Sequence, residues 1–196
     1  MKTCEKNRKL LHIVSGITIP LAIVFLPHLV VVLGLSIASI LYSVIELLRI
    51  NCFSFQKIFN KFCGIFLRQE EKEKLTGSSW IIFSALFCAL FFQKEIAALV
   101  MTLSIWGDAI AAIAGQKLGR IKIGKKTLEG SVACFTLCVL LLVFIFPALL
   151  KIEFSWLFIV IIALTVTILE FISDFFPLDD NLVIPIITGI IITLFF

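Results

Sequence analysis

The chain has 196 residues, of which 61% are hydrophobic, and its mean hydropathy is +1.15. A water-soluble domain has about 45–50% apolar residues, so this composition excludes a soluble globular enzyme. The formal net charge of +4 comes from 17 basic and 13 acidic side chains. The length leaves no room for a separate soluble catalytic domain between the apolar runs, so we expect the chemistry to lie at helix ends and in short loops.

Seven apolar runs approach the length of about 20 residues that a helix needs to cross a bilayer. They lie at residues 10–26, 29–48, 75–92, 95–114, 131–150, 154–172 and 182–196. The last is short for a hydrocarbon core about 30 Å thick. We therefore expect an all-α, polytopic integral membrane protein with about seven transmembrane helices, forming one membrane-embedded catalytic domain over residues 1–196.

Residues 50–74 form the longest polar stretch. Its phenylalanines recur mostly at steps of three and four, at Phe53, Phe55, Phe59, Phe62 and Phe66. Lysines and an arginine lie between and after them. This pattern predicts an amphipathic helix in the membrane interface, with its basic side toward lipid headgroups.

The basic residues are distributed unequally between the two ends of the predicted spans. With the N-terminus inside, the inner segments 1–9, 49–74 and 115–130 hold fifteen Lys and Arg residues, whereas the outer turns hold only Lys94 and Lys151. The positive-inside rule then predicts an N-in, C-out topology in a cell inner membrane or an endoplasmic-reticulum-like membrane.

This topology places the unusual polar residues on one side of the membrane. The basic loop after the fourth run and the acidic loop before the last run both face the cytoplasm. A small-solute transporter is expected to hold its polar groups nearer the midplane. The distribution therefore favours an enzyme with its active site on the cytoplasmic face, and nothing in it indicates a nucleic-acid partner or an oligomeric state.

The fourth run carries an acid and a face of small residues. Asp108, Ala111, Ala112, Gly115 and Gly119 fall at steps of three or four, so they share one helical face. Such a face lets backbone approach backbone, or lets backbone approach a ligand. Because an ionised acid is costly in hydrocarbon, Asp108 either ties two helices together or binds Mg²⁺.

A cationic loop leads into the fifth run. Thr127 and Glu129 suit a helix start, where Thr127 would cap and Glu129 would favour the positive end of the helix dipole. Lys125 and Lys126 oppose that dipole, whereas a bound phosphate would be met by both lysines and by free N–H groups. The residues alone leave a plain helix start and a phosphate site equally open.

The triplet Asp179-Asp180-Asn181 precedes the last run. It could cap the last helix, or it could bind a second metal ion or orient a substrate, because all three side chains can ligate a metal. Glu46 and Arg49, three residues apart at the end of the second run, could pair with each other or hold a substrate hydroxyl.

His12 lies at the entry to the first run. It is three and four residues after Lys9 and Arg8, so the three side chains share a helical face. Arg8 and Lys9 could form a second anion site beside the substrate.

Five motifs occur in a fixed order along the chain. They are Arg8-Lys9-x-x-His12, Leu75-Thr-Gly-Ser78, Gly107-Asp108-x-x-Ala111-Ala112-x-x-Gly115-x-x-x-Gly119, Lys126-Thr-Leu-Glu-Gly-Ser131 and Pro177-Leu-Asp-Asp-Asn-Leu-x-Ile-Pro185. Together they resemble the polyprenol kinase family, which contains dolichol kinases, phytol kinases and CTP-dependent diacylglycerol kinases. The resemblance covers nearly the whole chain.

The resemblance implies a kinase that transfers the γ-phosphate of CTP to the hydroxyl of a membrane lipid, with Mg²⁺ as cofactor. The acceptor would be a polyprenol or dolichol, a phytol-like alcohol or diacylglycerol. A phosphatidate cytidylyltransferase is the alternative, because it also combines CTP, Mg²⁺ and a lipid. A small-solute transporter is the alternative outside the enzymes.

The motifs and the chemistry of their residues give the expected site. Catalytic roles fall to Asp108, Glu129 and Asp180. Metal binding falls to Asp108, Glu129, Asp179, Asp180 and Asn181. Nucleotide binding falls to Gly107, Gly115, Gly119, Lys125, Lys126 and Thr127. Substrate binding falls to Arg8, Lys9, His12, Glu46 and Arg49.

Overall fold

The computed structural model describes residues 2–64, 74–151, 153–175 and 179–195, and it is almost entirely helical. The helices are α1 (Lys2–Phe25), α2 (His28–Asn51), α3 (Phe53–Cys63), α4 (Gly77–Phe91), α5 (Lys94–Leu118), α6 (Leu128–Leu140), α7 (Phe146–Leu150), α8 (Trp156–Ile172) and α9 (Asp180–Phe195). A π-helical turn, η3 (Leu141–Ile145), joins α6 to α7, and a 3₁₀ turn, η4 (Ser173–Phe175), comes after α8. A short hairpin of β1 (Lys122–Ile123) and β2 (Lys126–Thr127) separates α5 from α6.

The helices coincide with the predicted apolar runs. Within the described residues, three are long and apolar enough to cross a membrane, namely α2, α5 and the stretch Leu128–Leu149 that joins α6, η3 and α7. Four shorter apolar segments, His12–Phe25, Gly77–Phe91, Trp156–Ile172 and Asp180–Phe195, match the other four runs. The prediction of an all-α membrane protein is confirmed, whereas the number of crossings and the orientation stay predictions.

The outward surface of the helices is apolar, as a lipid-facing surface requires. Leu29, Trp156 and Leu157 are 69%, 69% and 72% exposed, respectively. In water such a surface would drive aggregation, whereas in a bilayer it is matched by hydrocarbon.

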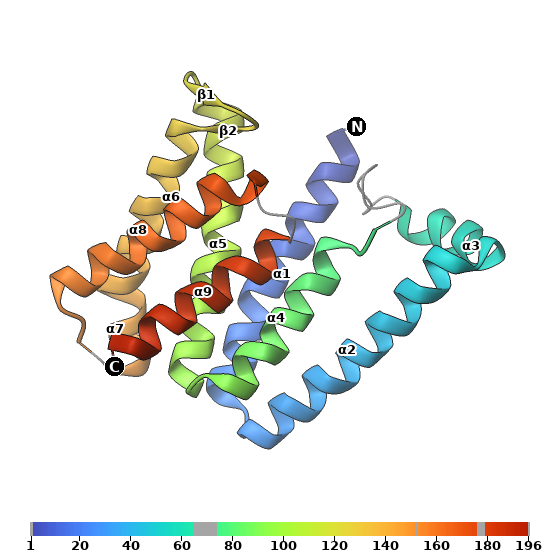
Figure 1. Ribbon diagram of the computed structural model, residues 1–196, viewed down its shortest axis with the longest axis horizontal. Coiled ribbons are helices and arrows are strands. Elements are labelled where there is room, and N and C mark those ends of the chain that lie inside the picture. The colour runs from blue at the N-terminus through green and yellow to red at the C-terminus, as the bar shows by residue number, and fades with distance from the viewer. Residues whose placement is uncertain (1, 65–73, 152, 176–178, 196) are drawn as a thin grey trace.

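Helix α5 is the central element of the bundle. It packs against α1, α4, α6, α8 and α9, and Figure 1 shows it in yellow-green among these helices. Ala97, Val100, Met101 and Leu103 are fully buried along its first half.

The small face of α5 allows backbone to approach backbone. A Cβ atom on Gly115 would lie 2.6 Å from Thr127 Oγ1, and one on Gly130 would lie 2.7 Å from the carbonyl oxygen of Ala111. Both approaches are too close for any side chain. Of the two interpretations of this face, the structure therefore uses close packing of α5 against α6 and the hairpin.

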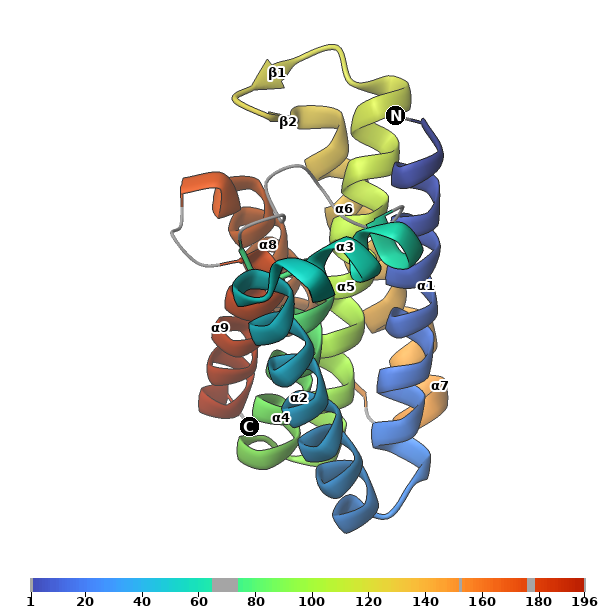
Figure 2. The same cartoon turned by 90° about the vertical axis from the view of Figure 1, so that its right-hand side faces the viewer.

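The polar segments gather toward one end of the bundle. In Figures 1 and 2 the N-terminus and the β1–β2 hairpin lie at the upper end, whereas the turn between α1 and α2 lies at the lower end. Helix α3 lies in the upper half, after the end of α2. This arrangement agrees with the shared polar face that the sequence predicts.

Helix α3 covers the first part of the predicted amphipathic segment, and residues 65–73 lie outside the described part of the chain. Its Phe53 and Ile58 are exposed, and Lys57 Nζ lies 4.6 Å from the centre of the Phe53 ring. Apolar side chains beside exposed lysines are typical of a helix in the membrane interface. The position of α3 relative to a bilayer stays a prediction.

Candidate active site

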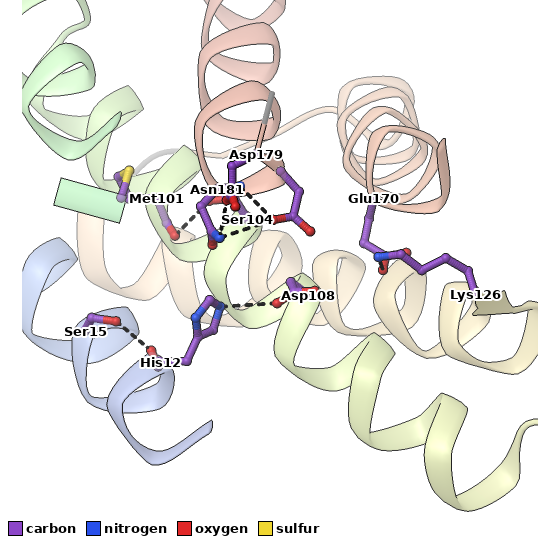
Figure 3. Close-up of polar contacts among 10 residues, drawn as sticks. His12, Ser15, Met101, Ser104, Asp108, Lys126, Glu170, Asp179 and Asn181 are labelled. Atoms are coloured by element: carbon purple, nitrogen blue, oxygen red, sulfur yellow. Dashed lines mark hydrogen bonds and ion pairs between the residues drawn. The ribbon is translucent and has the colours of Figure 1, made fainter. Parts of the chain in front are cut away.

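Asp108 lies on the central helix α5 and faces α1. Its Oδ2 atom is 3.4 Å from His12 Nε2, and both side chains are largely shielded, with exposed fractions of 27% and 16%. Figure 3 shows the imidazole directed from α1 toward this carboxylate. The sequence predicted a role for each residue, and the structure brings the two together.

The hairpin directs Lys126 into the bundle. In the β1–β2 register, Ile123 pairs with Lys126 and Lys122 pairs with Thr127, and Gly124 makes the turn with a φ of +64° that favours glycine. Lys125 is exposed at the turn, whereas Lys126 is half-buried. The two lysines, which the sequence treated alike, therefore have different surroundings.

Lys126 ends against an acid of α8. Its Nζ atom donates to Glu170 Oε1 over 2.5 Å, and the exposed fractions of the two side chains are 20% and 3%. Burial lowers the pKa of Lys126, but the negative charges of Glu170, Asp108 and Asp180 outweigh burial, so its pKa is raised overall. The ammonium therefore lies within electrostatic range of three carboxylates.

Asn181 ties together the two aspartates that precede and begin α9. Its backbone N–H donates to Asp179 Oδ1 over 3.1 Å and to Asp180 Oδ1 over 3.0 Å, and its Nδ2 donates to the same two oxygens over 2.7 and 3.1 Å. Burial and the neighbouring charge of Asp180 raise the pKa of Asp179 to about 6. Two carboxylates held this closely favour a bound cation.

Five elements thus contribute to one polar cluster, which we call the carboxylate cluster. Its members are His12 of α1, Asp108 of α5, Lys126 of β2, Glu170 of α8, and Asp179, Asp180 and Asn181 at the start of α9. Figure 3 labels all of these members except Asp180 and shows them on neighbouring elements around Asp108. With four acids and one lysine, the cluster carries excess negative charge close to the ends of apolar helices.

The carboxylate cluster fits Mg²⁺ bound together with a nucleotide. Among the described residues, no three His, Cys, Asp or Glu side chains are grouped closely enough to hold a metal ion by themselves. Mg²⁺ does not require such a cage, because it is usually bound by one or two carboxylates plus phosphate oxygens and water. Asp108 and one aspartate of the Asp179–Asp180 pair could supply these carboxylates, and their role in metal binding stays a prediction.

The carboxylate of Glu129 contacts the backbone of the hairpin segment. Its Oε1 and Oε2 atoms accept from the backbone N–H of Ile121 over 3.1 and 3.3 Å, which fastens the base of the hairpin. Its predicted catalytic and metal-binding roles stay predictions, and its observed contact is structural.

Thr127 and the predicted glycines take packing positions. Thr127 Oγ1 accepts from the Gly130 N–H over 3.2 Å and caps α6, as expected for a helix start. A Cβ atom on Gly119 would lie 2.7 Å from Thr127 Cγ2, and one on Gly107 would lie 3.1 Å from Cys134 Sγ. Nucleotide binding by these residues stays a prediction.

Glu46 and Arg49 form a separate buried network between α2 and α4. The Arg49 guanidinium donates through Nε to Glu46 Oε2 over 2.8 Å and through an NH2 group to the carbonyl oxygen of Lys74. Glu46 Oε1 accepts from the hydroxyls of Thr76 and Ser79 over 2.7 and 2.9 Å. The pairing that the spacing allowed is confirmed, and a role in substrate binding stays a prediction.

Arg8 and Lys9 have only their backbone described, as part of α1, because the side chains of residues 1–11 lie outside the described part of the structure. Their predicted role as an anion site next to His12 therefore lies outside the described side chains and stays a prediction.

Glu170 is the member of the cluster that the sequence-based site omitted. The residue as a whole is 2% exposed, and it lies in the last turn of α8, in an otherwise apolar run. The signal that drew attention to Asp108, an acid inside an apolar run, was equally present at Glu170.

Comparison with known proteins adds an independent observation. The chain is 28% identical over 187 residues to an uncharacterized protein, RP860, of Rickettsia prowazekii, covering 93% of this chain and 90% of that one. It is 31% identical over 106 residues to CTP-dependent diacylglycerol kinase 1 of Saccharomyces cerevisiae, covering 53% of this chain and 37% of the yeast protein. The corresponding kinase of Schizosaccharomyces pombe is 28% identical over 163 residues, covering 76% and 73%. Plant phytol kinases also align with it.

These relatives support the resemblance of the chain to the polyprenol kinase family. The names of these relatives support the expectation of a lipid kinase, a phosphotransferase with an alcohol acceptor. The chain spans just over a third of the Saccharomyces cerevisiae relative and about three quarters of the Schizosaccharomyces pombe one. No protein-family model matches the chain, and no solved structure matches it.

Proposed function

We propose that this chain transfers the γ-phosphate of CTP to the free hydroxyl of diacylglycerol in the membrane, with the active site on the cytoplasmic face. The donor and the acceptor are those named for its yeast relatives. The observation that carries the proposal is the carboxylate cluster, in which Lys126 pairs with Glu170 and lies within electrostatic range of Asp108 and Asp180. It combines the cation and the carboxylates that a metal-bound polyphosphate requires.

The chemistry is an in-line displacement. The lipid hydroxyl oxygen attacks the γ-phosphorus, the bond from that phosphorus to the β,γ-bridging oxygen breaks, and CDP leaves with the bridging oxygen. The products are a lipid monophosphate and CDP. The hydroxyl proton passes to a carboxylate of the cluster, either Asp108 or Asp180.

Positioning and charge neutralisation are the main tasks of the protein in such a transfer. Asp108 and Asp180 would hold Mg²⁺, whose charge would offset that of the phosphates. Lys126 adds a cation on the side of α8, and Asn181 holds the two aspartates in place. His12 contacts Asp108 and fixes the orientation of its carboxylate.

The location of the cluster suits a lipid acceptor. The helices around it expose apolar side chains along their length, so the acyl chains of a lipid can stay in hydrocarbon while its glycerol hydroxyl reaches the helix ends. A water-soluble alcohol has no acyl chains, so the apolar surface around the cluster would not help to bind it. The position of the acids therefore supports a membrane lipid as acceptor, in addition to the names of the relatives.

The test uses purified protein in mixed micelles with CTP, Mg²⁺ and one lipid alcohol at a time, and it measures CDP and phosphorylated lipid. We expect both products with diacylglycerol, and much less with dolichol, with phytol or with ATP in place of CTP. Preference for dolichol or phytol would overturn the proposed acceptor, and preference for ATP would overturn the proposed donor. Release of pyrophosphate with a CDP-lipid would indicate a cytidylyltransferase.

A further inference from the structure

Three carboxylates compete for the single ammonium of the carboxylate cluster. Asp108, Asp180 and Glu170 all act on the charge of Lys126, and the hydrogen bond goes to Glu170. Lysine has a flexible four-carbon stem, so its ammonium settles near whichever acid holds it best. The pairing with Glu170 keeps the ammonium on the α8 side of the cluster.

A simple tie between the hairpin and α8 is the alternative explanation of this ion pair. The two side chains differ in exposure, and an ion pair that only joined the hairpin to α8 would not require this difference. Glu170 is 3% exposed and lies in an apolar helix, whereas Lys126 is 20% exposed. A buried carboxylate needs a partner, but a partly exposed lysine next to two further acids could have paired with either of them. The placement of Glu170 therefore determines where the positive charge lies.

We propose that Glu170 is a positioning residue that holds the Lys126 ammonium away from Asp108 and Asp180, so that these two carboxylates remain available for a divalent cation. The lysine then meets the nucleotide phosphates from the opposite side. The inference rests on the proposed function and adds a residue and a role to it. Nothing in it requires Glu170 to touch the substrate or the metal.

Removal of the negative charge at Glu170 should redirect the Lys126 ammonium. In Glu170→Gln the ammonium pairs with Asp108 and Asp180, because they are the remaining acids within its range. It then competes with the divalent cation for the same oxygens. Divalent-cation binding should weaken by about tenfold, as expected when a fixed positive charge occupies a metal-binding carboxylate pair.

Removal of both charges should reverse this effect. In Lys126→Met combined with Glu170→Gln, no ammonium competes for the aspartates and no buried charge is left without a partner, so the protein should fold. Divalent-cation binding should return to the wild-type level or exceed it, whereas lipid phosphorylation should stay low. A residue that served only as a structural tie would not give this reversal.

The experiment titrates purified protein in micelles with Mn²⁺, as a paramagnetic substitute for Mg²⁺, and measures bound Mn²⁺ by electron paramagnetic resonance. Glu95→Gln, at the opposite end of α5, is the control and should bind as wild type does. The titration contains neither nucleotide nor lipid, so its result is separate from the lipid-labelling result that decides the proposed function.

Weaker binding in Glu170→Gln, restored in the double variant, is the expected result. Unchanged binding in Glu170→Gln would overturn the inference, and so would a double variant that binds as weakly as the single one. Wild-type protein that binds no Mn²⁺ would overturn it as well. If Glu170→Gln does not fold, the double variant must still bind Mn²⁺ at least as tightly as wild type, and weaker binding there contradicts the proposal.

Discussion

His12 and Asp108 join the first helix to the central helix, with His12 Nε2 3.4 Å from Asp108 Oδ2. The contact brings a residue near the beginning of the chain to the acid of the Gly-Asp motif. An acid at this depth is expected to face a protein interior or a wet cavity, and here it faces an imidazole, a lysine and further acids. The contact therefore places Asp108 inside a polar site.

Replacement of Asp108 by Asn keeps the size of the side chain and removes its charge. We expect Asp108→Asn to lower kcat by about a hundredfold or more, because both charge neutralisation and proton transfer would lose a partner. The unfolding temperature should change little. Initial rates of lipid phosphorylation and thermal unfolding of the same preparations check this, with Glu95→Gln as the matched control on α5. Near wild-type turnover would make Asp108 a structural residue.

His12→Gln tests the partner of Asp108. Glutamine retains a hydrogen-bonding group, but it does not reproduce the ring, so the carboxylate loses its fixed neighbour. We expect kcat to fall by about tenfold while the KM for CTP changes little, since the effect acts through orientation. His28→Gln is the control, because His28 contacts the carbonyl oxygen of Ala89 in another part of the bundle. Equal effects of the two substitutions on kcat would refute a special role for His12.

The positions of the helices could be predicted from the sequence because long apolar runs and their polar breaks determine them. The packing of α5 could be predicted in part, since Gly115 and Gly119 showed a small face but did not show what would pack on it. In the structure, the side chain of Thr127 packs against Gly115 and Gly119. The hairpin was missed because its strands have two residues each and depend on the turn at Gly124, so no alternating pattern could form.

The composition of the site depends on tertiary contacts that spacing does not show. Lys125 and Lys126 are adjacent in the sequence, yet only Lys126 turns inward, because Lys125 lies exposed in the turn whereas Lys126 begins β2 and reaches Glu170. Glu170 comes from a helix far along the chain and meets Lys126 only in the folded bundle. The sequence likewise did not show that Glu129 accepts from the backbone N–H of Ile121, and its catalytic and metal-binding roles stay predictions.

The raised pKa of Asp179 predicts a pH-dependent stability in the absence of divalent cations. Its pKa is about 6 in the folded protein against an ordinary value of 3.8, so the folded state holds the proton more tightly than the unfolded state. Protonation thus stabilises the fold, and this stabilisation is lost as the pH rises through about 6.

Thermal unfolding in EDTA between pH 5 and pH 7 measures this effect. We expect the unfolding temperature to fall across this range in wild type, and to vary less in Asp179→Asn. Added Mg²⁺ should reduce the loss at pH 7 by compensating the ionised carboxylates. An unfolding temperature with the same pH dependence in both proteins would contradict the assignment to Asp179.

The orientation can be measured at Cys52, an exposed cysteine between α2 and α3. Cys88, Cys134 and Cys138 are buried, and Cys4 and Cys63 are replaced by serine to leave one reactive thiol. The N-in topology predicts that an impermeant thiol reagent modifies Cys52 only after the cytoplasmic side is opened. Glu153→Cys, in the exposed turn before α8, should react from outside. Labelling of Cys52 in intact cells would contradict the N-in topology and indicate the opposite orientation.

The position of the transferred phosphorus label tests the proposed kinase reaction most directly. Two parallel reactions contain wild-type protein, diacylglycerol and Mg²⁺, one with CTP labelled at the γ-phosphate and the other with CTP labelled at the α-phosphate. We expect label in the lipid fraction from the γ-position only, together with CDP in the aqueous fraction, and far less of both products with Asp108→Asn. Label in the lipid from the α-position would contradict the assignment as a CTP-dependent lipid kinase.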